Sequence, residues 1–362
     1  MTWVHELRTY TAAGVEQHRI SDYTWLACTV RVNAPGMLSA GLPGDHAAIT
    51  ALEHRSQVEL WRKNDELGID WYHHFGGLYL KQNRKMPDTR KFTLYAPGYP
   101  WLLGTRVINW AADTTSRTAF VSAKAETIMK TLVSYNAGSA ATVANGRKRE
   151  GAITGLSSQA DGANGSTLDW YCFGDNLLES LQKLARIAGG DFDLSKTAAN
   201  AFEFRWYTGQ RGTDRTADVI FAVERGNMGA PEYDYDHLDE HTAACTWGAG
   251  EGAQRSYVTR TGADYAAGND VELFVNASDA KTTAGLNARG DQKLDEARAR
   301  EVLSFTIQQT PSCMYNLHYF VGDLVTVVNP FTGASFPAKI NAGTLGLQAE
   351  GMIETSIEVA TL

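Results

Sequence analysis

The sequence predicts a β-rich α+β protein in which two β-rich parts flank a small α+β domain. Strand-like segments dominate both ends of the chain, whereas two amphipathic helices and a hairpin dominate the middle. The length of 362 residues exceeds a usual domain of about 100 to 200 residues, so we expect two or three packed units. Hydrophobic residues make up 43 % and charged residues 20 % of the chain, which excludes a largely disordered protein.

The first part, residues 1–105, is expected to consist mainly of strands. Alternating, β-branched or aromatic residues between Gly, Pro and Asp predict strands at 23–32, 57–61, 71–81 and 91–95. Residues 45–53 instead predict one short helix, which starts after Gly44. We expect this helix to close one end of a barrel.

The middle part, residues 106–210, changes to a helical pattern. Apolar residues recur at intervals of three and four in residues 123–135 and 176–188, which predicts two amphipathic helices. Gly189 and Gly190 end the second helix. Residues 191–194 and 201–207 then alternate as the two strands of a hairpin do.

In the third part, residues 211–362, the strand pattern returns. It predicts strands at 219–223, 243–247, 304–308, 323–328 and 355–359. One predicted helix, residues 287–303, interrupts them, and its inner positions are Leu294, Ala297, Val302 and Leu303. Because both ends of the chain are β-rich, we expect them to form a pair of similar domains.

Five short motifs follow one another along nearly the whole chain in a recognisable order. They are Val58-Glu59-Leu60-Trp61-Arg62 followed by Trp71 and Gly76-Gly77; Tyr95-Ala96-Pro97-Gly98 followed by Leu102-Leu103 and Arg106; Gly212-Thr213-Asp214-Arg215-Thr216 followed by Arg225-Gly226-Asn227-Met228; Gly248-Ala249-Gly250-Glu251-Gly252 with Arg255; and Gly322-Asp323-Leu324-Val325-Thr326-Val327. In this order and spacing the chain resembles the baseplate hub proteins of the siphovirus tail tip. That family is related in fold to contractile-tail baseplate hubs and to type VI spike bases.

The resemblance implies a structural virion protein and not an enzyme. The β-rich parts would be two tube-like β-barrel domains, with the predicted helix at about 287–303 inserted in the second. Three chains would form a pseudo-six-fold ring at the distal tail tip of a bacteriophage, assembled after synthesis in the host cytoplasm. The implied partners are the distal tail protein and tail tube, the tape-measure protein, and spike or tail fibre proteins. DNA would pass through the lumen, and the family brings no catalytic residues, metal ligands or cofactor.

Net charge, apolar stretches and cysteine spacing indicate which kinds of ligand, targeting segment and cysteine chemistry to expect. The 33 Lys and Arg against 41 Asp and Glu give a net charge of -8, which disfavours specific nucleic-acid binding and predicts a neutral to acidic lumen. Residues 1–8 have no signal-peptide pattern, and apolar stretches such as 324–328 are far shorter than a membrane span of about 20 residues. Cys28, Cys172, Cys245 and Cys313 form no C-x-x-C pair and are expected to be buried thiols.

One motif offers an enzymatic alternative. His237, Glu240 and His241 match H-x-x-E-H, the pattern of zinc metallopeptidases with inverted ligand order. In such an enzyme both histidines lie on one helix, bind zinc, and flank Glu240 as the general base. The flanking residues here predict an acidic turn that leads into a strand, which favours a structural interpretation. A tail-associated zinc metallopeptidase remains the alternative function.

The remaining candidate sites are weaker. Gly248, Gly250 and Gly252 lack the spacing and following helix of a dinucleotide loop, and His73 and His74 would face opposite sides of a strand. The acidic loop 232–241 could hold a cation through Asp234, Asp236, Asp239 and Glu240, although it lacks the ligand spacing of an EF-hand. Four tryptophans could form a carbohydrate platform, but core or interface positions are favoured for them; they are Trp101, Trp110, Trp170 and Trp206.

Overall fold

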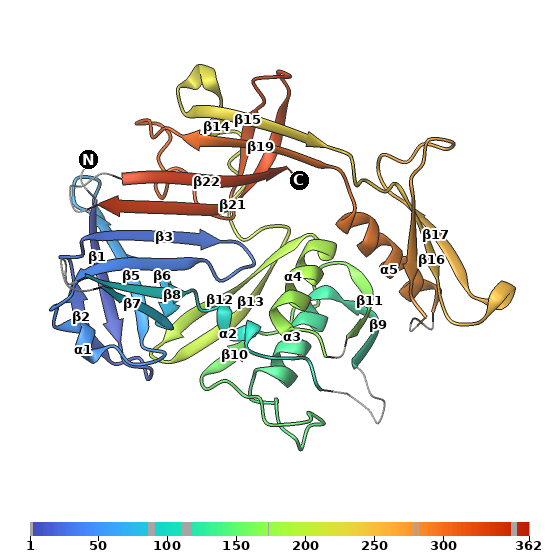
Figure 1. Ribbon diagram of the computed structural model, residues 1–362, viewed down its shortest axis with the longest axis horizontal. Helices are drawn as coiled ribbons and strands as arrows, with labels where there is room; N and C mark the ends of the chain where they lie inside the picture. The colour runs from blue at the N-terminus through green and yellow to red at the C-terminus, as the bar shows by residue number, and fades with distance from the viewer. Residues whose placement is uncertain are drawn as a thin grey trace.

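The computed structural model describes residues 3–85, 91–110, 118–172, 174–278, 280, 282–348 and 353–361. The protein is β-rich and has few helices, as the sequence predicts. No helix in these ranges is both long and apolar enough to span a bilayer. A large sheet occupies one side of the molecule, the α+β segment lies beside it, and a small sheet with one helix projects at the far end (Figure 1).

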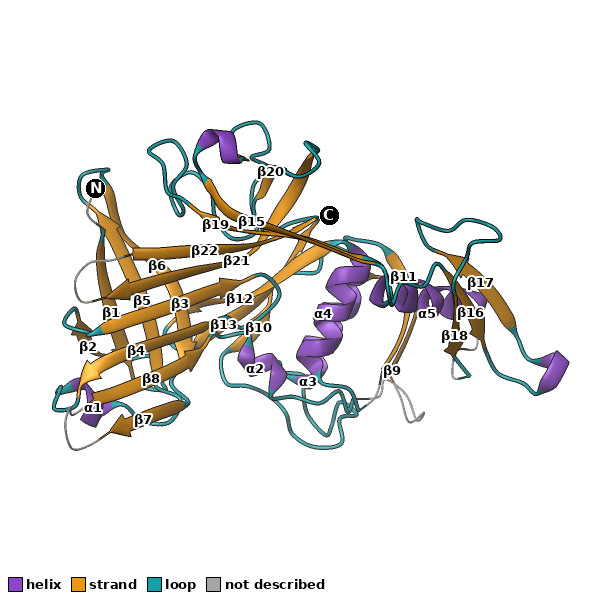
Figure 2. Cartoon of the chain, turned by 45° about the horizontal axis from the view of Figure 1, so that its top comes forward, coloured by secondary structure: helices purple, strands orange, loops and turns teal. Residues whose placement is uncertain are grey.

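The large sheet contains an antiparallel path of eight strands drawn from both ends of the chain (Figure 2). The path runs through β15 (Met228–Asp236), β19 (Arg300–Ile307), β22 (Ile353–Thr361), β21 (Ser335–Gln348), β3 (Trp25–Arg31), β4 (Met37–Pro43), β8 (Lys91–Pro97) and β7 (Lys81–Lys85). Outside this path, β20 (Leu324–Val328) pairs with β21 and with β14 (Ile220–Phe221). Segments more than 300 residues apart in the sequence therefore share one sheet, as β3 and β21 do.

A second sheet covers the half of this path formed by β3, β4, β8 and β7. Its order is β2 (Glu16–Ile20), β1 (Val4–Tyr10), β5 (Gln57–Asn64) and β6 (Ile69–Leu78). Alternate residues of each strand point inward, because side chains change face at every residue. The resulting core contains Leu7, Ile20, Val58, Leu60 and Phe75 from the covering sheet and Leu26, Cys28, Leu38 and Leu94 from the large sheet. Of the predicted helix 45–53 only α1 (Ala48–Ala51) forms, beside β2.

A second core lies under the other half of the path. It is built from alternate residues of β19, β20 and β21 and from the segment 313–321. Phe221 and Tyr319 are fully buried there and meet edge to face with ring centroids 5.2 Å apart. Short helical turns, η1 (Val223–Arg225) and η2 (Gly252–Gln254), lie in the connections of this part of the chain.

The α+β segment confirms the predicted helices and hairpin. Helices α3 (Ala125–Asn136) and α4 (Leu177–Ala188) pack together with α2 (Trp101–Gly104), and β12 (Gly190–Ala198) pairs with β13 (Ala201–Thr208). The Asn176 side chain caps α4 by accepting hydrogen bonds from two backbone N–H groups. Gly189 ends the helix with φ 63°, in the left-handed region that glycine adopts easily. The other strands are β10 (Leu156–Ser158), beside β13, and the pair β9 (Thr118–Lys124) and β11 (Thr167–Cys172).

The projecting part consists of β16 (Ala243–Trp247), β17 (Tyr257–Thr261) and β18 (Glu272–Asn276), which α5 (Thr283–Glu296) covers. The prediction of a helix over 287–303 is wrong at both ends, because α5 begins at Thr283 and ends at Glu296. Val302 and Leu303 belong to β19 instead. Every second residue of β19 is buried in the second core, namely Leu303, Phe305 and Ile307. The apolar residues there follow the two-residue repeat of a strand and not the repeat of a helix.

Candidate functional site

The strand pair β3 and β21 joins the two β-rich ends of the chain. Its register runs from Arg31 opposite Ala342 to Trp25 opposite Gln348 without a bulge. At its centre, the hydroxyl oxygens of Thr29 and Thr344 lie 2.9 Å apart and share a hydrogen bond across the strands. The two ends of the chain are therefore halves of one continuous wall.

One face of this wall is covered and the other is open. The covered face carries the two apolar cores. Residues directly opposite each other in a ladder share a face, so the register assigns a second set of residues to the opposite face, here called the open face. Many of its described members between the edge strands are small, and they include Ala27, Thr29, Ser39, Gly41, Thr93, Ser304, Thr306, Thr344, Gly346 and Ser356. Larger members are Trp25, Met37, Pro43, Tyr95, Pro97 and Gln348, and the cations Arg31 and Lys91 lie at the end of β3 and the start of β8.

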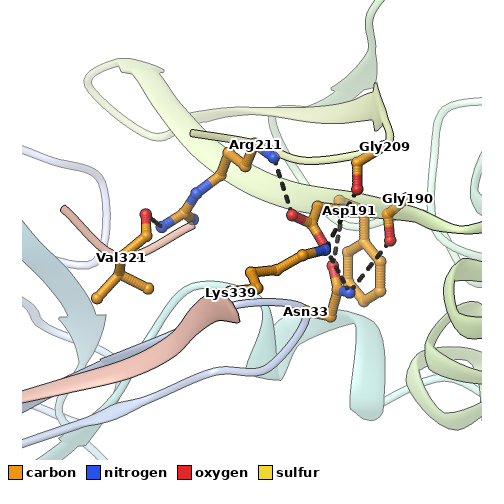
Figure 3. Close-up of polar contacts among 8 residues, drawn as sticks. Asn33, Gly190, Asp191, Gly209, Arg211, Val321 and Lys339 are labelled. Carbon is orange, nitrogen blue, oxygen red and sulfur yellow. Dashed lines mark hydrogen bonds and ion pairs between the residues drawn. The ribbon is translucent and has the colours of Figure 1, made fainter. Parts of the chain in front are cut away.

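A buried carboxylate fixes the α+β segment to the end of this wall (Figure 3). Asp191, at the start of β12, is only 1 % exposed. Its carboxylate accepts hydrogen bonds from the Lys339 ammonium at 3.0 Å, from the Arg211 backbone N–H at 2.8 Å and from the Asn33 amide at 3.2 Å. These groups, here called the Asp191 junction, come from the ends of β3 and β12, from the connection after β13 and from β21.

The partners of Asp191 are themselves held in place. The Asn33 amide oxygen accepts a hydrogen bond from the Phe192 backbone N–H at 2.6 Å, and Lys339 also donates to the Gly209 carbonyl at 3.2 Å. The buried carboxylate thus has a counter-charge and hydrogen-bond donors, and its donors have defined acceptors, as buried charged and polar groups require. The junction can hold three parts of the chain in one geometry, but it offers no nucleophile or open coordination position.

A second buried carboxylate, Glu59, links the covering sheet to β12. It accepts hydrogen bonds from the Lys196 ammonium at 2.7 Å, the Trp61 indole at 2.9 Å and the Tyr99 hydroxyl at 3.1 Å. Burial alone would raise the pKa of Glu59, but the charges and hydrogen bonds around it, from His73 and Lys196 above all, lower that pKa below its ordinary value. Glu59 therefore acts as a paired structural anion.

The H-x-x-E-H residues form a turn and not a helix. The Glu240 backbone N–H donates to the His237 carbonyl at 3.2 Å, and the His237 ring lies 2.7 Å from the Glu240 carboxylate. The His241 ring nitrogen lies 3.1 Å from the Asp239 carbonyl oxygen. His237 and Glu240 thus engage each other instead of facing a shared ion with His241. Within the described ranges, no three His, Cys, Asp or Glu side chains gather as metal ligands would.

The other candidate residues take structural positions. Gly250 has φ 115° and lies in the loop between β16 and β17, where a glycine is required. His73 packs on Trp61 whereas His74 packs on Tyr72 and Tyr315, so the two rings are held by different neighbours.

The candidate tryptophans and the cysteines also take structural positions. Trp110, Trp170 and Trp206 are buried, and Trp101 packs partly against the core that contains Trp170 and Trp206, which confirms the core interpretation. Cys28, Cys172 and Cys313 are buried free thiols and Cys245 is half-buried. Burial, with a smaller contribution from Asp175, raises the pKa of Cys172 to about 12, so this thiol is unreactive.

Sequence reasoning missed the Asp191 junction altogether. Asp191 and Lys339 are 148 residues apart, and no local spacing signals that they meet. Asn33 has φ 55°, an uncommon conformation for a residue other than glycine, but the sequence around it shows only an ordinary turn composition.

Comparison with known proteins identifies the family. The model of the family described as Siphovirus ReqiPepy6 Gp37-like protein matches residues 6–359. The chain belongs to this siphovirus family. No curated protein sequence matches the chain.

Solved phage tail proteins share the fold of this siphovirus protein over its whole length. The 43 kDa tail protein of prophage MuSo2 from Shewanella oneidensis superposes with a TM-score of 0.62 at 12 % identity, covering 99 % of this chain and 98 % of that one. The prophage tail protein gp18 from Listeria monocytogenes gives 0.59 at 10 % identity, with 98 % and 94 % covered. A chain of the Francisella PdpA–VgrG complex gives 0.55 at 6 % identity, covering 99 % of this chain and 52 % of that one. The Gp37-like protein thus has the fold of these phage tail proteins.

Proposed function

We propose that this Gp37-like protein is the hub of the siphovirus tail tip. Three copies form a ring with pseudo-six-fold symmetry at the distal end of the virion tail. The ring joins the tail tube and distal tail protein to the spike or tail fibres. Its lumen passes the tape-measure protein and the DNA, and the protein itself catalyses no reaction.

The observation that carries this proposal is the continuous sheet through β3 and β21. Each β-rich end contributes half of one wall and has its own apolar core on the same side. Two such halves per chain supply six similar units from three chains, which matches a six-fold tube. We accordingly assign residues 1–105 and 211–362 to two tube-like barrel domains and residues 106–210 to the α+β domain between them.

The open face supports a lumen lining. Where β3 pairs with β21, small residues such as Thr29, Thr344 and Gly346 present neither apolar anchors nor phosphate-binding cations, whereas the cations Arg31 and Lys91 of this face lie at strand ends. A passing polyanion would not be retained by such a surface, because tight binding of DNA depends on neutralisation of its phosphates by Lys and Arg. The Asp191 junction would keep the α+β domain at the end of the wall, where it can contact neighbouring tail proteins.

Native mass spectrometry of the purified full-length chain, together with class averages of isolated tail tips, tests the proposal. We expect three copies per ring and a central channel. A monomer or dimer in the assembled particle would refute the hub function. Zinc analysis of the same sample addresses the peptidase alternative, which requires about one zinc ion per chain, whereas the hub requires none.

A further inference from the structure

The two edge strands of the eight-strand path carry opposite charges. At one edge, β7 has the sequence Lys81-Gln82-Asn83-Arg84-Lys85, and all five residues are exposed. At the other edge, β15 carries Glu232 and Asp234, both exposed, and the half-buried Asp236. Within the described part of the chain, none of these six charged side chains forms an ion pair, and each edge strand has a ladder partner on one side only.

Five of these six charged side chains lie on the same face of the sheet, whereas Arg84 lies opposite the buried Phe92 and belongs to the other face. In β7, Lys81 and Lys85 lie opposite Tyr95 and Lys91 of β8, whereas the buried residues of β8 alternate with these positions. In β15, Glu232 lies opposite Ser304 of β19, next to the buried Leu303. Side chains two residues apart on a strand lie on the same face. Asn83 is therefore on the face of Lys81 and Lys85, and Asp234 and Asp236 are on the face of Glu232. By the pairing with β8 and β19, both sets belong to the open face.

Strand direction allows the two edges to meet. Every neighbouring pair in the path is antiparallel, and the path has eight strands. The first and last strands therefore run in opposite directions. When one copy is rotated about an axis parallel to the wall, its β15 arrives beside β7 of the neighbouring copy in antiparallel orientation, which continues the ladder without a change of pattern.

The charges also select the kind of contact. A two-fold dimer through β7 would place lysine against lysine, and one through β15 would place carboxylate against carboxylate, which is unfavourable in both cases. Only the head-to-tail contact of β7 with β15 brings opposite charges together. A head-to-tail contact is the kind that generates a closed ring, whereas the like charges on each edge work against pairwise association.

We propose that β7 of one copy adds as an antiparallel strand to β15 of a second copy of this chain. The register that uses the whole of β7 places Lys81 opposite Asp236, Asn83 opposite Asp234 and Lys85 opposite Glu232. This contact is the joint between subunits, and in that sense it rests on the proposed ring.

Charge reversal tests the contact on the full-length protein. K81E/K85E and E232K/D236K each turn two attractive pairs into repulsive ones. We expect each variant to raise the protein concentration at which half of the chains are in rings by about tenfold or more, measured by native mass spectrometry across a dilution series. The combined four-residue variant exchanges the signs of both edges, and it should return this concentration to near the wild-type value.

The control variant K148E/R149E makes the same change in net charge as K81E/K85E, at two exposed positions in the α+β segment. It should leave the ring unchanged. Rings that persist in both single-edge variants would overturn the edge contact while leaving the proposed hub function intact. Failure of the four-residue variant to recover would likewise count against direct pairing, provided that its circular dichroism spectrum is that of the wild type.

Cross-linking tests the contact separately from ring closure. Asn83→Cys protein is mixed with Asp234→Cys protein and treated with a short thiol-reactive cross-linker, since opposed residues in a ladder have Cβ atoms about 5 Å apart. We expect cross-linked pairs that contain one chain of each kind, and none from either protein alone. If the wild-type protein is monomeric but the two cysteine variants give these mixed pairs, the ring is contradicted and the edge contact is supported. If no mixed pairs form, the edge contact is contradicted.

Discussion

Removal of the Asp191 carboxylate should destabilise the protein strongly, because it leaves a buried partner without its counter-charge. In the Asp191→Ala variant, the Lys339 ammonium keeps only the Gly209 carbonyl as a hydrogen-bond partner (Figure 3). The backbone N–H of Arg211 and the Asn33 amide also lose an acceptor. All of these groups lie at the boundary between the α+β segment and the large sheet.

The structure sets the size of the effect. The loss of one partner from a fully buried ion pair costs about 3 to 5 kcal/mol. Asp191 has a side chain that is 1 % exposed but that of Lys339 is 14 % exposed, so some water reaches the ammonium and the lower part of that range applies. We therefore expect Asp191→Ala to reduce the free energy of unfolding by about 3 kcal/mol.

Urea denaturation followed by tryptophan fluorescence measures this change. Trp206 lies opposite Phe192 in the hairpin that carries Asp191, so its emission reports on this region. The matched control is Glu203→Ala on the neighbouring strand. Its carboxylate is 2.6 Å from Arg205, but the two side chains are 27 % and 38 % exposed, and the expected loss is below about 1 kcal/mol.

A double variant separates charge pairing from other effects. Lys339→Met added to Asp191→Ala removes the unpaired ammonium, so the loss for the double variant should be smaller than the sum of the two single losses by about 1 kcal/mol or more. Additive losses, or a loss below about 1 kcal/mol for Asp191→Ala alone, would refute the description of the junction as a buried, coupled pair.

Three further predictions concern single side chains. Folding lowers the pKa of Glu59. Its carboxylate therefore stabilises the folded state at pH values above the ordinary pKa of about 4.3, and this stabilisation is lost as the pH falls below that value. The difference in urea midpoint between wild type and Glu59→Gln should be large at pH 7 and shrink below about pH 4. His237→Ala should leave the zinc content, folding and ring assembly unchanged, and loss of a peptidase activity in this variant would contradict the structural interpretation. Thr29→Lys should permit assembly but slow DNA release from particles, measured by dye fluorescence, because it adds a cation to the proposed lumen; Thr29→Ser is its control.

The sequence predicted the helices of the α+β segment well because their signals are local. In α4, the apolar spacing, the capping Asn176 and the terminal Gly189 all lie within the helix or beside it. The same pattern failed for α5, because the apolar residues of β19 follow only a few residues after Glu296 and were counted as further helical turns. Whether the apolar residues of β19 form helical turns or a strand depends on pairing with strands that are far away in the sequence.

The longest strand, β21, escaped prediction for a related reason. It contains Gly343 and Gly346, and glycine is unfavourable in an isolated strand. A Cβ atom at Gly343 would lie 2.4 Å from the Tyr315 hydroxyl, so a glycine is needed there for close packing against another segment. Asp191 and Lys339 could not be paired from the sequence either, because their contact depends on the completed sheet.

The charged edges and the lining of the proposed lumen constrain each other. Lys81 and Lys85 lie on the open face, and as free cations in the lumen they would bind passing phosphates, contrary to a channel for DNA. Pairing with Glu232 and Asp236 of the next copy removes this conflict for Lys81 and Lys85, since each of them then faces a carboxylate at the contact and has little charge left for the polyanion. The acidic residues of β15 would thus serve two purposes, because they attract the neighbouring edge during assembly and neutralise it in the finished channel. Edge charges that were merely protective against aggregation would need no opposite sign on the other edge.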